Sequence, residues 1–548
     1  MESHCLPFRE IPHTAQLYSL FLDDFSRVAS YYAHPPTAAG IDAAAREVRL
    51  DPGVRRAVVE ILREQNRRFG PGETLDAAAA RNLDRLAAGA VAIVTGQQVG
   101  LFSGPAYTIY KAISAIRCAE ETTRRGADAV PIFWLATEDH DIAEVNQSSW
   151  VTRHGLSRYE LPVNEADAGR RVGEVTLGAA IEPLVAQAAQ TLEGPGAENI
   201  ARALRESYAA GDTYGSAFGK LMARLLAGRG IIFIDPLDAR LHRLAAPVYL
   251  RAVDESDSLR DALLARSTQL DSAGLHAQVK VTRETTLLFY TAAGRREPLR
   301  SRNGGFVAGN LALSRDDLAA TIEKTPEVCS PSALLRPVVQ DALLPTAAYI
   351  GGPAEVAYMA QAQVVYTKIL SRMSAILPRA SFTIVDPPIA RFLAQYGLEV
   401  RDLFGGPQHV RAAMEQKSLS GALAGRFDAG EEGLHKLMEA FEEPLGRLDA
   451  TLVDALHSTE RKMLHQFSQL KAKAARAESF RSGVLDRHQR ILLDSLYPHG
   501  GMQERTLCAL PLLAAWGPGL LDNLTDLASM ESPAGGGSCA QGHQILFL

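Results

Sequence analysis

The sequence predicts an α/β fold built on an open, mostly parallel β-sheet, with a separate long helical segment further along the chain. Three short apolar runs predict buried strands, and stretches with helical spacing lie between them. A stripe of apolar residues at spacings of mainly three and four, within residues 434–470, predicts long helices in a projecting hairpin or coiled coil. We therefore expect a core with helices on both sheet faces and a distinct helical domain.

The strands are predicted where short apolar runs stop at polar residues or glycine. Residues 90–94, 130–135 and 230–234 are such runs, and residues 107–123 between the first two have helical spacing. This strand–helix–strand order is typical of parallel strands that are buried on both faces. The three runs are therefore expected in one sheet.

Helical and strand-rich stretches flank these runs. Residues 15–32, 54–69 and 74–88 carry apolar residues at helical spacing, so a helical lead-in is expected before the first strand. Residues 275–310 alternate apolar and polar residues, which predicts a strand-rich insertion or a sheet edge. Residues 340–377 return to alternating helix and strand patterns.

The long helical segment is the least typical part of the chain. Pro444 interrupts the apolar stripe, so a helix is expected to end or kink there. Residues 445–480 would then form one helix, about 50 Å long at 1.5 Å per residue, which is too long for a compact domain. Its hairpin partner is expected in residues 481–496 together with part of 408–440. An ordinary helical bundle is the alternative.

The chain is predicted to have three parts. Residues 1–400 form the core with its helical lead-in and insertions, residues 401–500 the helical coiled-coil domain, and residues 501–548 a C-terminal segment that returns to the core. Within the last part, residues 532–538 predict a loop by composition, and residues 543–548 predict a terminal strand.

The composition is that of an ordinary globular protein. Of 548 residues, 47% are hydrophobic and 22% charged, which allows a large core and a real pocket. The 57 basic and 63 acidic residues give a net charge of −6, which argues against nucleic acid or a membrane surface as partner. Five scattered cysteines predict no disulfide framework, no cysteine-rich zinc site and a reducing compartment. No signal peptide or membrane span is expected, so the predicted location is the cytoplasm.

A glycine-punctuated loop follows the first predicted strand and opens a helix, over residues 95–111. In an open parallel sheet this is where ligands bind, near the free N–H groups of a helix. The glycine spacing fits neither a dinucleotide fingerprint nor a P-loop. Gln97 and Gln98 could bind a polar uncharged group, and Lys111 could face an anion. A tight strand–helix connection without any ligand is the alternative.

An acidic cluster follows the second predicted strand. Glu138, Asp139, His140 and Asp141 are adjacent, and Glu144 and Asn146 follow closely. Clustered carboxylates raise one another's pKa, which favours proton transfer near neutral pH, and His140 is the natural general base. Two alternatives are a metal site, because His and Asp bind several metals, and a helix N-terminal cap formed by Asp139 or Asp141.

Two later segments contain further polar candidates. Arg336, within residues 330–341, could clamp a carboxylate, although a structural salt bridge is the alternative. Gly351 and Gly352 would allow close backbone approach to a ligand. Residues 496–505 indicate a turn and nothing more.

Together these segments resemble the bacillithiol-biosynthesis cysteine-adding enzymes of the BshC type. The resemblance rests on GQQVGLFSGPAYTIYK, VPIFWLATEDHDIAEVN, SPSALLRPVVQD, LPTAAYIGGPAEVAY and LYPHGGMQER, in that order, and covers nearly the whole chain. It implies a Rossmann-like parallel-sheet core with connecting-peptide insertions, a C-terminal α-helical coiled coil, and a homodimer through that coiled coil. It also implies a cysteine ligase, which joins the carboxyl of L-cysteine to the amine of glucosaminyl-malate in the last step of bacillithiol synthesis.

The resemblance also implies roles for particular residues. His140, supported by Asp139 or Asp141 and with Glu138 nearby, would deprotonate the attacking amine, and Arg336 and Lys111 would hold the malyl carboxylates. The full set of expected substrate-binding residues is Gln97, Gln98, Gly100, Ser103, Gly104, Tyr107, Lys111, Asn146, Arg336, Gln340, Gly351, Gly352 and Glu355.

The resemblance further implies an adenine nucleotide, ATP or ADP, near the coiled coil, with Tyr497, Gln503 and Arg505 as its candidate contacts. Mg²⁺ is a candidate companion ion, and no protein metal ligand and no redox cofactor are predicted. Two other functions are kept as alternatives. One is a non-catalytic small-molecule or nucleotide-binding protein with a coiled-coil dimerisation arm, and the other is a related ligase that acts on another amine.

Overall fold

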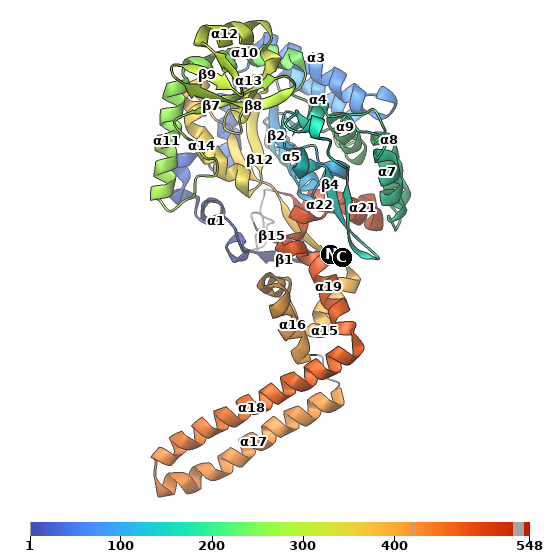
Figure 1. The fold of residues 1–548 in the computed structure, drawn as a ribbon, viewed down its shortest axis with the longest axis vertical. Coiled ribbons are helices and arrows are strands. Elements are labelled where there is room, and N and C mark those ends of the chain that lie inside the picture. Colours follow the sequence, from blue (N-terminus) through green and yellow to red (C-terminus); the bar gives the residue numbers. More distant parts are fainter. Residues whose placement is uncertain (1, 418–420, 530–541) are drawn as a thin grey trace. The chain divides into compact units, whose positions relative to one another are not determined.

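The computed structural model describes residues 2–417, 421–529 and 542–548 (Figure 1). Its internal contacts divide the chain into two units. The larger unit contains residues 4–382 and 504–544, and the smaller contains residues 383–503 with short terminal pieces. Residues 383–400, which the sequence analysis assigned to the core, thus belong to the smaller unit by their contacts. Of the predicted C-terminal segment, residues 504–544 belong to the larger unit and residues 545–548 to the smaller one.

The lead-in of the larger unit is helical. It consists of α1 (Gln16–Asp23), α2 (Ala38–Glu47), α3 (Pro52–Phe69) and α4 (Ala77–Ala88). The side chains of Asp51 and Asp76 accept hydrogen bonds from the first backbone amides of α3 and α4, which fixes where these helices begin. The predicted helices at 54–69 and 74–88 are confirmed, whereas only the first half of the stretch at 15–32 is α-helical.

The central sheet has five parallel strands, in the order β13-β12-β2-β3-β6. They are β2 (Val91–Gln97), β3 (Ala129–Leu135), β6 (Ile232–Ile234), β12 (Thr346–Gly351) and β13 (Ala375–Pro378). Every residue of β3 is buried, so both faces of the sheet are covered. The three strands predicted from apolar runs are therefore confirmed as β2, β3 and β6.

The strand order fixes where a ligand can bind. Numbered along the chain, the five strands lie across the sheet as 3-2-1-4-5, which is the Rossmann order. The order reverses between β2 and β12. From β2 the chain continues to β3 on one side of the sheet, and from β12 it continues to β13 on the other side. Open α/β sheets bind ligands in the crevice outside the carboxyl ends of the strands at such a point.

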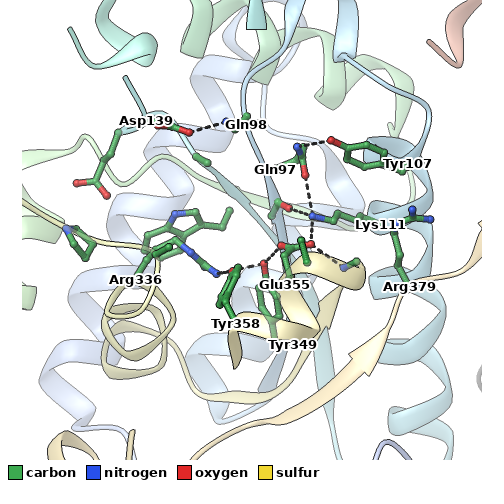
Figure 2. Close-up of a pocket in the computed structure, with 18 of the residues that line it drawn as sticks. Gln97, Gln98, Tyr107, Lys111, Asp139, Arg336, Tyr349, Glu355, Tyr358 and Arg379 are labelled. Atoms are coloured by element: carbon green, nitrogen blue, oxygen red, sulfur yellow. Dashed lines mark hydrogen bonds and ion pairs between the residues drawn. The ribbon is translucent and has the colours of Figure 1, made fainter. Parts of the chain in front are cut away.

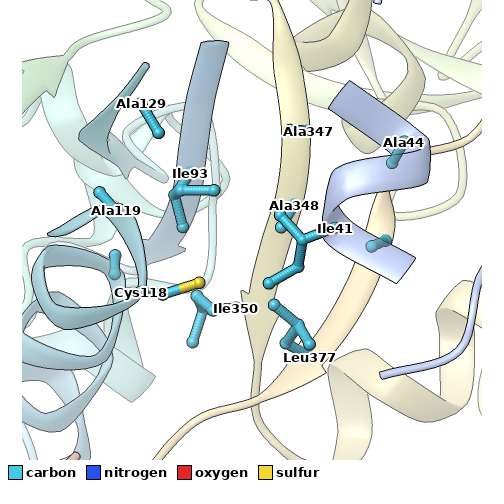
Figure 3. Packing of buried hydrophobic residues seen from close by; sticks show 12 residues of the cluster. Ile41, Ala44, Ile93, Cys118, Ala119, Ala129, Ala347, Ala348, Ile350 and Leu377 are labelled. Atoms are coloured by element: carbon cyan, nitrogen blue, oxygen red, sulfur yellow. The ribbon is translucent and has the colours of Figure 1, made fainter. Parts of the chain in front are cut away.

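Small side chains pack the helices closely against this sheet. Ile93 of β2 and Ile350 of β12 share a buried cluster with Ile41 of α2 and with Cys118 of α5 (Tyr107–Arg124) (Figure 3). Much of the remaining cluster is alanine, which lets helix and strand backbones approach closely.

Two insertions interrupt the alternation of strands and helices. The first, between β3 and β6, is the hairpin β4 (Gln147–Thr152) and β5 (Gly155–Glu160), followed by α7 (Ile181–Gln190), α8 (Ala197–Ser207) and α9 (Tyr214–Leu225). The second, between β6 and β12, begins with α10 (Ala239–Asp254) and α11 (Ser256–Ser272).

The second insertion continues as an antiparallel sheet in the order β10-β9-β8-β7-β11, which confirms the strand-rich region predicted at 275–310. Asn303 and Gly304 form the turn between two of its strands, both with positive φ. The strands and following helices are β7 (Thr285–Ala292), β8 (Arg295–Arg302), β9 (Gly305–Ala308), β10 (Leu311–Leu313), β11 (Cys329–Pro331), α12 (Arg315–Lys324) and α13 (Arg336–Leu343).

Further helices and a small sheet come from residues after β12 and from the two ends of the chain. After β12 comes α14 (Pro353–Ile369), and the C-terminal segment contributes α21 (Leu510–Trp516) and α22 (Pro518–Leu527). A three-stranded sheet has the order β1 (Glu2–Leu6), β15 (His543–Phe547) and β14 (Ser381–Val385), which confirms the predicted terminal strand. The loop predicted at 532–538 lies outside the described residues.

The smaller unit contains a long antiparallel helical hairpin (Figure 1). Its two arms are α17 (Gly421–Leu448) and α18 (Thr451–Ser482). The rings of Phe427 and Phe467, one from each arm, meet with centroids 5.3 Å apart. The unit also contains α15 (Pro387–Tyr396), α16 (Gly406–Lys417) and α19 (Val484–Leu496).

The predicted limits of the hairpin were wrong. A single helix over 445–480, with a partner in 481–496 and part of 408–440, is replaced by two arms that meet at Asp449 and Ala450. Residues 421–440 of the expected partner do lie in the first arm, whereas residues 484–496 form a separate helix. The Asp449 carboxylate accepts hydrogen bonds from the backbone N and the hydroxyl of Thr451, both at 2.8 Å, and so starts a new helix. Pro444 lies inside α17 and does not end it.

No helix within the described part of the chain combines the length and the hydropathy that a membrane span requires.

Candidate functional site

A pocket of about 480 Å³ lies at the carboxyl ends of β2 and β12, where the strand order reverses. All of its lining residues belong to the larger unit. A cavity of this size suits a small-molecule substrate. Of the residues predicted from sequence, the pocket brings together Gln97, Gln98, Tyr107, Lys111, Glu138, Asp139, His140, Arg336, Gly352, Glu355 and Arg505.

A buried ion pair occupies one side of the pocket. Lys111 of α5 contacts the Glu355 carboxylate of α14 at ion-pair distance (Figure 2). The same ammonium group donates to the carbonyl of Gly96 at 2.9 Å and to Oε1 of Gln97 at 2.8 Å. Its three donors are thus used within the protein. Lys111 can hold a substrate carboxylate only by exchanging one of these partners.

Glu355 is held as a carboxylate by several donors. Burial alone would raise its pKa, but the charge of Lys111 and the bonded donors outweigh burial and lower it. The donors are the Tyr349 hydroxyl at 2.5 Å and the backbone N–H of Gly352 at 2.8 Å. The second bond also closes the N-terminus of α14.

Arg336 is a cation whose bonded partners are all neutral. Its guanidinium donates to Oε1 of Gln340 at 2.9 Å and to the Tyr358 hydroxyl at 2.9 Å, and lies over the ring of Tyr349 (Figure 2). Among the described residues no carboxylate forms an ion pair with it, so the alternative of a structural salt bridge finds no partner. Arg336 is half-buried and lines the pocket, where it can receive an anionic group.

The acidic cluster after β3 is organised by Gln98 and Arg296. The Gln98 amide donates to carboxylates of Asp139 and Glu144, both at 2.7 Å. The Nδ1 atom of His140 lies 3.1 Å from a guanidinium nitrogen of Arg296. Because a guanidinium only donates, this bond assigns Nδ1 as the acceptor and leaves the ring proton on Nε2.

His140 is therefore arranged as a donor rather than as a base. Burial and then the charge of Arg296 lower its pKa, which keeps the ring neutral near pH 7, although Asp139 opposes the shift. Its Nε2–H can donate a hydrogen bond to an oxygen that gains negative charge.

Glu138 has the properties that a proton acceptor needs. Burial raises its pKa from 4.5 to about 7, although Arg296 and Arg171 act in the opposite direction. The residue is buried and lines the pocket, and its Oε1 atom has no hydrogen-bond partner among the described residues. A carboxylate with a pKa near the working pH is an effective general base.

Arg379 brings the C-terminal segment into contact with the pocket lining. Its guanidinium binds the Glu504 carboxylate with two bonds of 2.9 and 2.6 Å and lies 5.3 Å from the ring centroid of Tyr107. Sequence reasoning missed Arg379 and Arg296, because neither lies in a recognisable motif. Tyr349 and Tyr358, which hold Arg336 and Glu355, lie within one of the quoted motifs and could have been chosen.

The glycine loop after β2 forms a tight turn outside the pocket lining. Gly100, Ser103 and Gly104 do not line the pocket. The backbone of Phe102 is held by the Tyr208 hydroxyl at 2.9 Å and by the Cys508 thiol at 3.1 Å. A Cβ on Gly100 would lie 3.0 Å from Cα of Gly104, and Gly104 has a φ of 66°, so close packing favours glycine at 100 and backbone conformation favours it at 104.

Four other predicted residues also lie outside the pocket lining. Asn146 is buried and donates to the Leu161 carbonyl at 2.8 Å. Gln340 is buried and supports Arg336. Gly351 is the last residue of β12, and Asp141 is exposed at the start of a short helix.

The three candidate nucleotide contacts differ in their surroundings. Arg505 is exposed and lines the pocket. The Gln503 amide bonds the backbone N–H and carbonyl of Ile384 at 2.8 and 2.9 Å and the Ser495 carbonyl at 2.8 Å. The Tyr497 ring packs against Phe404 with centroids 5.1 Å apart. Gln503 is thus fully engaged with backbone groups. Across residues 2–417, 421–529 and 542–548, no three His, Cys, Asp or Glu side chains form a potential metal site.

The strand order, the two insertions and the polar crevice define a Rossmann-like α/β protein, and the hairpin adds a helical coiled-coil unit. Residues 1–380 match the N-terminal Rossmann-like domain of bacillithiol biosynthesis BshC, and residues 382–533 match the C-terminal coiled-coil domain of the same family. The chain belongs to the BshC family. The resemblance to this family and the fold class, both predicted from the sequence, are confirmed.

Similar proteins cover almost the full chain. A protein of Koribacter versatilis is 38% identical over 525 residues, 96% of this chain and 97% of its own length. A protein of Solibacter usitatus is 37% identical over 97% of this chain and 98% of its own, and one of Salinibacter ruber is 32% identical over 94% and 95%. Each carries the name "Putative cysteine ligase BshC".

Proposed function

We propose that the chain is a ligase that joins the carboxyl of L-cysteine to the amine of glucosaminyl-malate, in the last step of bacillithiol biosynthesis. The observation that carries the proposal is the pocket itself. It places Arg336, a cation without an acidic partner among the described residues, in one crevice with Glu138 and His140. The name of the similar proteins, putative cysteine ligase, supports cysteine as a substrate, and the description of the matched family supports bacillithiol biosynthesis.

Arg336 would bind a carboxylate of the malyl group. Its planar guanidinium can donate two parallel hydrogen bonds to a carboxylate. Its present partners are neutral hydroxyl and amide groups, so exchanging them for a substrate carboxylate breaks no ion pair within the described part of the chain. Arg505 is exposed on the pocket lining and would supply a second positive charge. Lys111, which was expected in this role, is engaged by Glu355 and would instead hold the pocket wall in place.

Glu138 would accept the proton of the attacking amine. As the amine nitrogen bonds to the activated carboxyl carbon of cysteine, the bond from that carbon to the oxygen of the activating phosphate breaks and the phosphate group leaves. One N–H bond of the amine also breaks, and its proton moves to the Glu138 carboxylate. His140 would donate its Nε2–H to the carboxyl oxygen, where negative charge develops. The base expected from sequence was His140, and the bond from Arg296 favours the exchange of roles.

The carboxyl of cysteine must be activated before an amine can displace its oxygen. An adenine nucleotide with Mg²⁺ would supply this activation as an adenylate or an acyl phosphate. Of the three nucleotide contacts expected from sequence, Gln503 is engaged with backbone groups, whereas Arg505 is exposed on the pocket lining and open to a phosphate.

We further propose that the protein is a cytoplasmic homodimer joined through the α17–α18 hairpin. Large apolar side chains lie exposed along both arms, which favours a protein partner. They include Leu437, Phe441, Leu448, Met463 and Leu470. Sedimentation of the protein should give the mass of a dimer, and substitution of Phe441 and Leu470 by serine should give a monomer. A monomeric unmodified protein would contradict this part of the proposal.

The ligase assay uses purified protein with cysteine, glucosaminyl-malate, ATP and Mg²⁺, followed by mass spectrometry. The expected products are bacillithiol and either AMP or ADP. Arg336→Met should raise KM for glucosaminyl-malate by about 10- to 100-fold, because a charge-assisted hydrogen-bond pair is lost. Arg63→Met, which breaks an exposed ion pair with Asp84, is the matched control and should leave KM unchanged. Absence of product would reject the ligase, and product from another amino sugar alone would redirect it to another amine.

A further inference from the structure

Next to Glu138, and outside the pocket lining, two residues of α10 form a buried polar pair. The Nε2 atom of His242 lies 3.6 Å from Oε1 of Glu138, and the Tyr249 hydroxyl lies 3.3 Å from the other ring nitrogen of His242. His242 and Tyr249 are each 2% exposed. Neither residue belongs to the sequence motifs that point to the pocket.

Where His242 meets Glu138, two buried atoms lack hydrogen-bond partners within the described residues and lie 3.6 Å apart. They are Oε1 of Glu138 and Nε2 of His242. Unpartnered buried polar groups are costly and uncommon. A separation slightly beyond bonding range is typical of catalytic contacts that tighten only when substrate binds.

The bonding pattern fixes how His242 can act. Burial raises the pKa of Tyr249 well above 10, so its hydroxyl keeps its proton and can donate it to Nδ1 of His242. The ring proton then lies on Nε2 and points at Glu138. Burial also lowers the pKa of His242 to about 4, so the ring is a neutral donor at neutral pH and takes no proton from Glu138.

We propose that His242, oriented by Tyr249, is a positioning residue that donates its Nε2–H to the Glu138 carboxylate and keeps that carboxylate ready to accept the proton of the attacking amine. This inference rests on the proposed ligase function and adds to it a residue pair that does not touch substrate. During the step the N–H bond of the amine breaks and an O–H bond forms on Glu138. His242 keeps its own proton throughout.

Several other charged groups act on Glu138 from neighbouring elements. Arg296 of β8, Arg171 before β6 and Arg336 of α13 favour its charged form, and Asp235 after β6 opposes it. Asp139 and His140 are adjacent in the chain. Because these groups stay in place when His242 is changed, a shift caused by the substitution reports the lost donor and not a change in the surrounding charge.

The test is the pH dependence of kcat/KM for the ligase reaction in the full-length protein. His242→Leu removes the donor, so the Glu138 carboxylate is less favoured and the acid limb should move to higher pH by about one unit. His242→Gln keeps an N–H near the position of Nε2 and should restore the limb to within a few tenths of a unit. Tyr249→Phe removes the hydroxyl that keeps the His242 proton on Nε2. The acid limb of the kcat/KM profile should therefore also move to higher pH, by less than in His242→Leu.

His34→Leu is the matched control, because His34 is also buried and its Nε2 lies 3.2 Å from a carboxylate, that of Glu47, outside the pocket. It should leave the acid limb unchanged. A uniform loss of activity in His242→Leu and Tyr249→Phe, with no movement of the limb, would overturn the inference. If His242→Leu does not fold, the Tyr249→Phe and His242→Gln profiles decide. An inactive unmodified protein would instead count against the ligase function itself.

Discussion

The buried ion pair between Arg379 and Glu504 should contribute strongly to the stability of the larger unit. Both side chains are nearly inaccessible, at 4% and 1% exposure, and two bonds of 2.9 and 2.6 Å join them. Glu504 also accepts from the Ser381 hydroxyl at 2.7 Å and from the backbone of Phe382 at 3.0 Å. Glu504→Gln would leave the guanidinium buried without a compensating charge.

The expected loss is about 3–5 kcal/mol in the free energy of unfolding, which is the usual effect of removing one partner of a buried pair. Burial by itself would raise the pKa of Glu504, but Arg379 outweighs burial and holds the pKa below its ordinary value of 4.5. The stabilisation is therefore present above pH 4.5 and is lost as the pH falls through the lower folded-state pKa. Glu504→Gln should flatten this acid dependence.

Tryptophan emission during urea unfolding measures the stability of the larger unit, which contains the ion pair. The three tryptophans, at 134, 150 and 516, all lie in the larger unit together with Arg379 and Glu504. Asp84→Asn is the control, since its partner Arg63 is exposed and such pairs contribute at most about 1 kcal/mol. A loss below about 1 kcal/mol in Glu504→Gln would refute the reasoning.

Three further predictions concern the pocket and its supporting loop. Because Glu138 accepts a proton only when ionised, kcat/KM should rise with pH through about 7, and Glu138→Gln should lower it by about 10²–10⁴-fold and remove that rise. His140→Ala should lower kcat by about 10²–10³-fold with the urea midpoint unchanged, and normal turnover would exclude it from the mechanism. Gly104 has φ 66° and ψ −154°, so Gly104→Ala should cost about 1–3 kcal/mol in urea unfolding, whereas Gly178→Ala, in open space, should cost much less.

The pattern of apolar runs was sufficient to predict the main strands of the core. Such runs reflect burial on both sheet faces, and burial leaves a local mark in the sequence. The helical hairpin was less well predicted, because the apolar stripe continues through Pro444 and past the turn. The turn at Asp449 depends on one capping carboxylate, which spacing alone does not distinguish from an exposed helical residue.

The site was predicted in part, since the carboxyl ends of β2, β3 and β12 carry polar residues that the parallel sheet brings to one edge. Contacts between distant segments then decided which of them face the pocket. In the segment predicted to bind a ligand, both ends line the pocket, whereas the glycine loop between them lies outside the lining and is held by Tyr208 and Cys508. Arg296, from the second insertion, reaches His140 and changes which ring nitrogen carries the proton.

The sequence by itself determined the family, the parallel-sheet core and the segments that supply the site, because motifs and apolar runs are properties of short stretches. The tertiary structure alone decided the charge state and the partner of each polar side chain. Lys111 forms an ion pair with Glu355, whereas Arg336 bonds neutral partners. His242 of α10 lies 3.6 Å from Glu138. The physical reason is that pKa values and hydrogen bonds depend on burial and on groups brought together from distant parts of the chain.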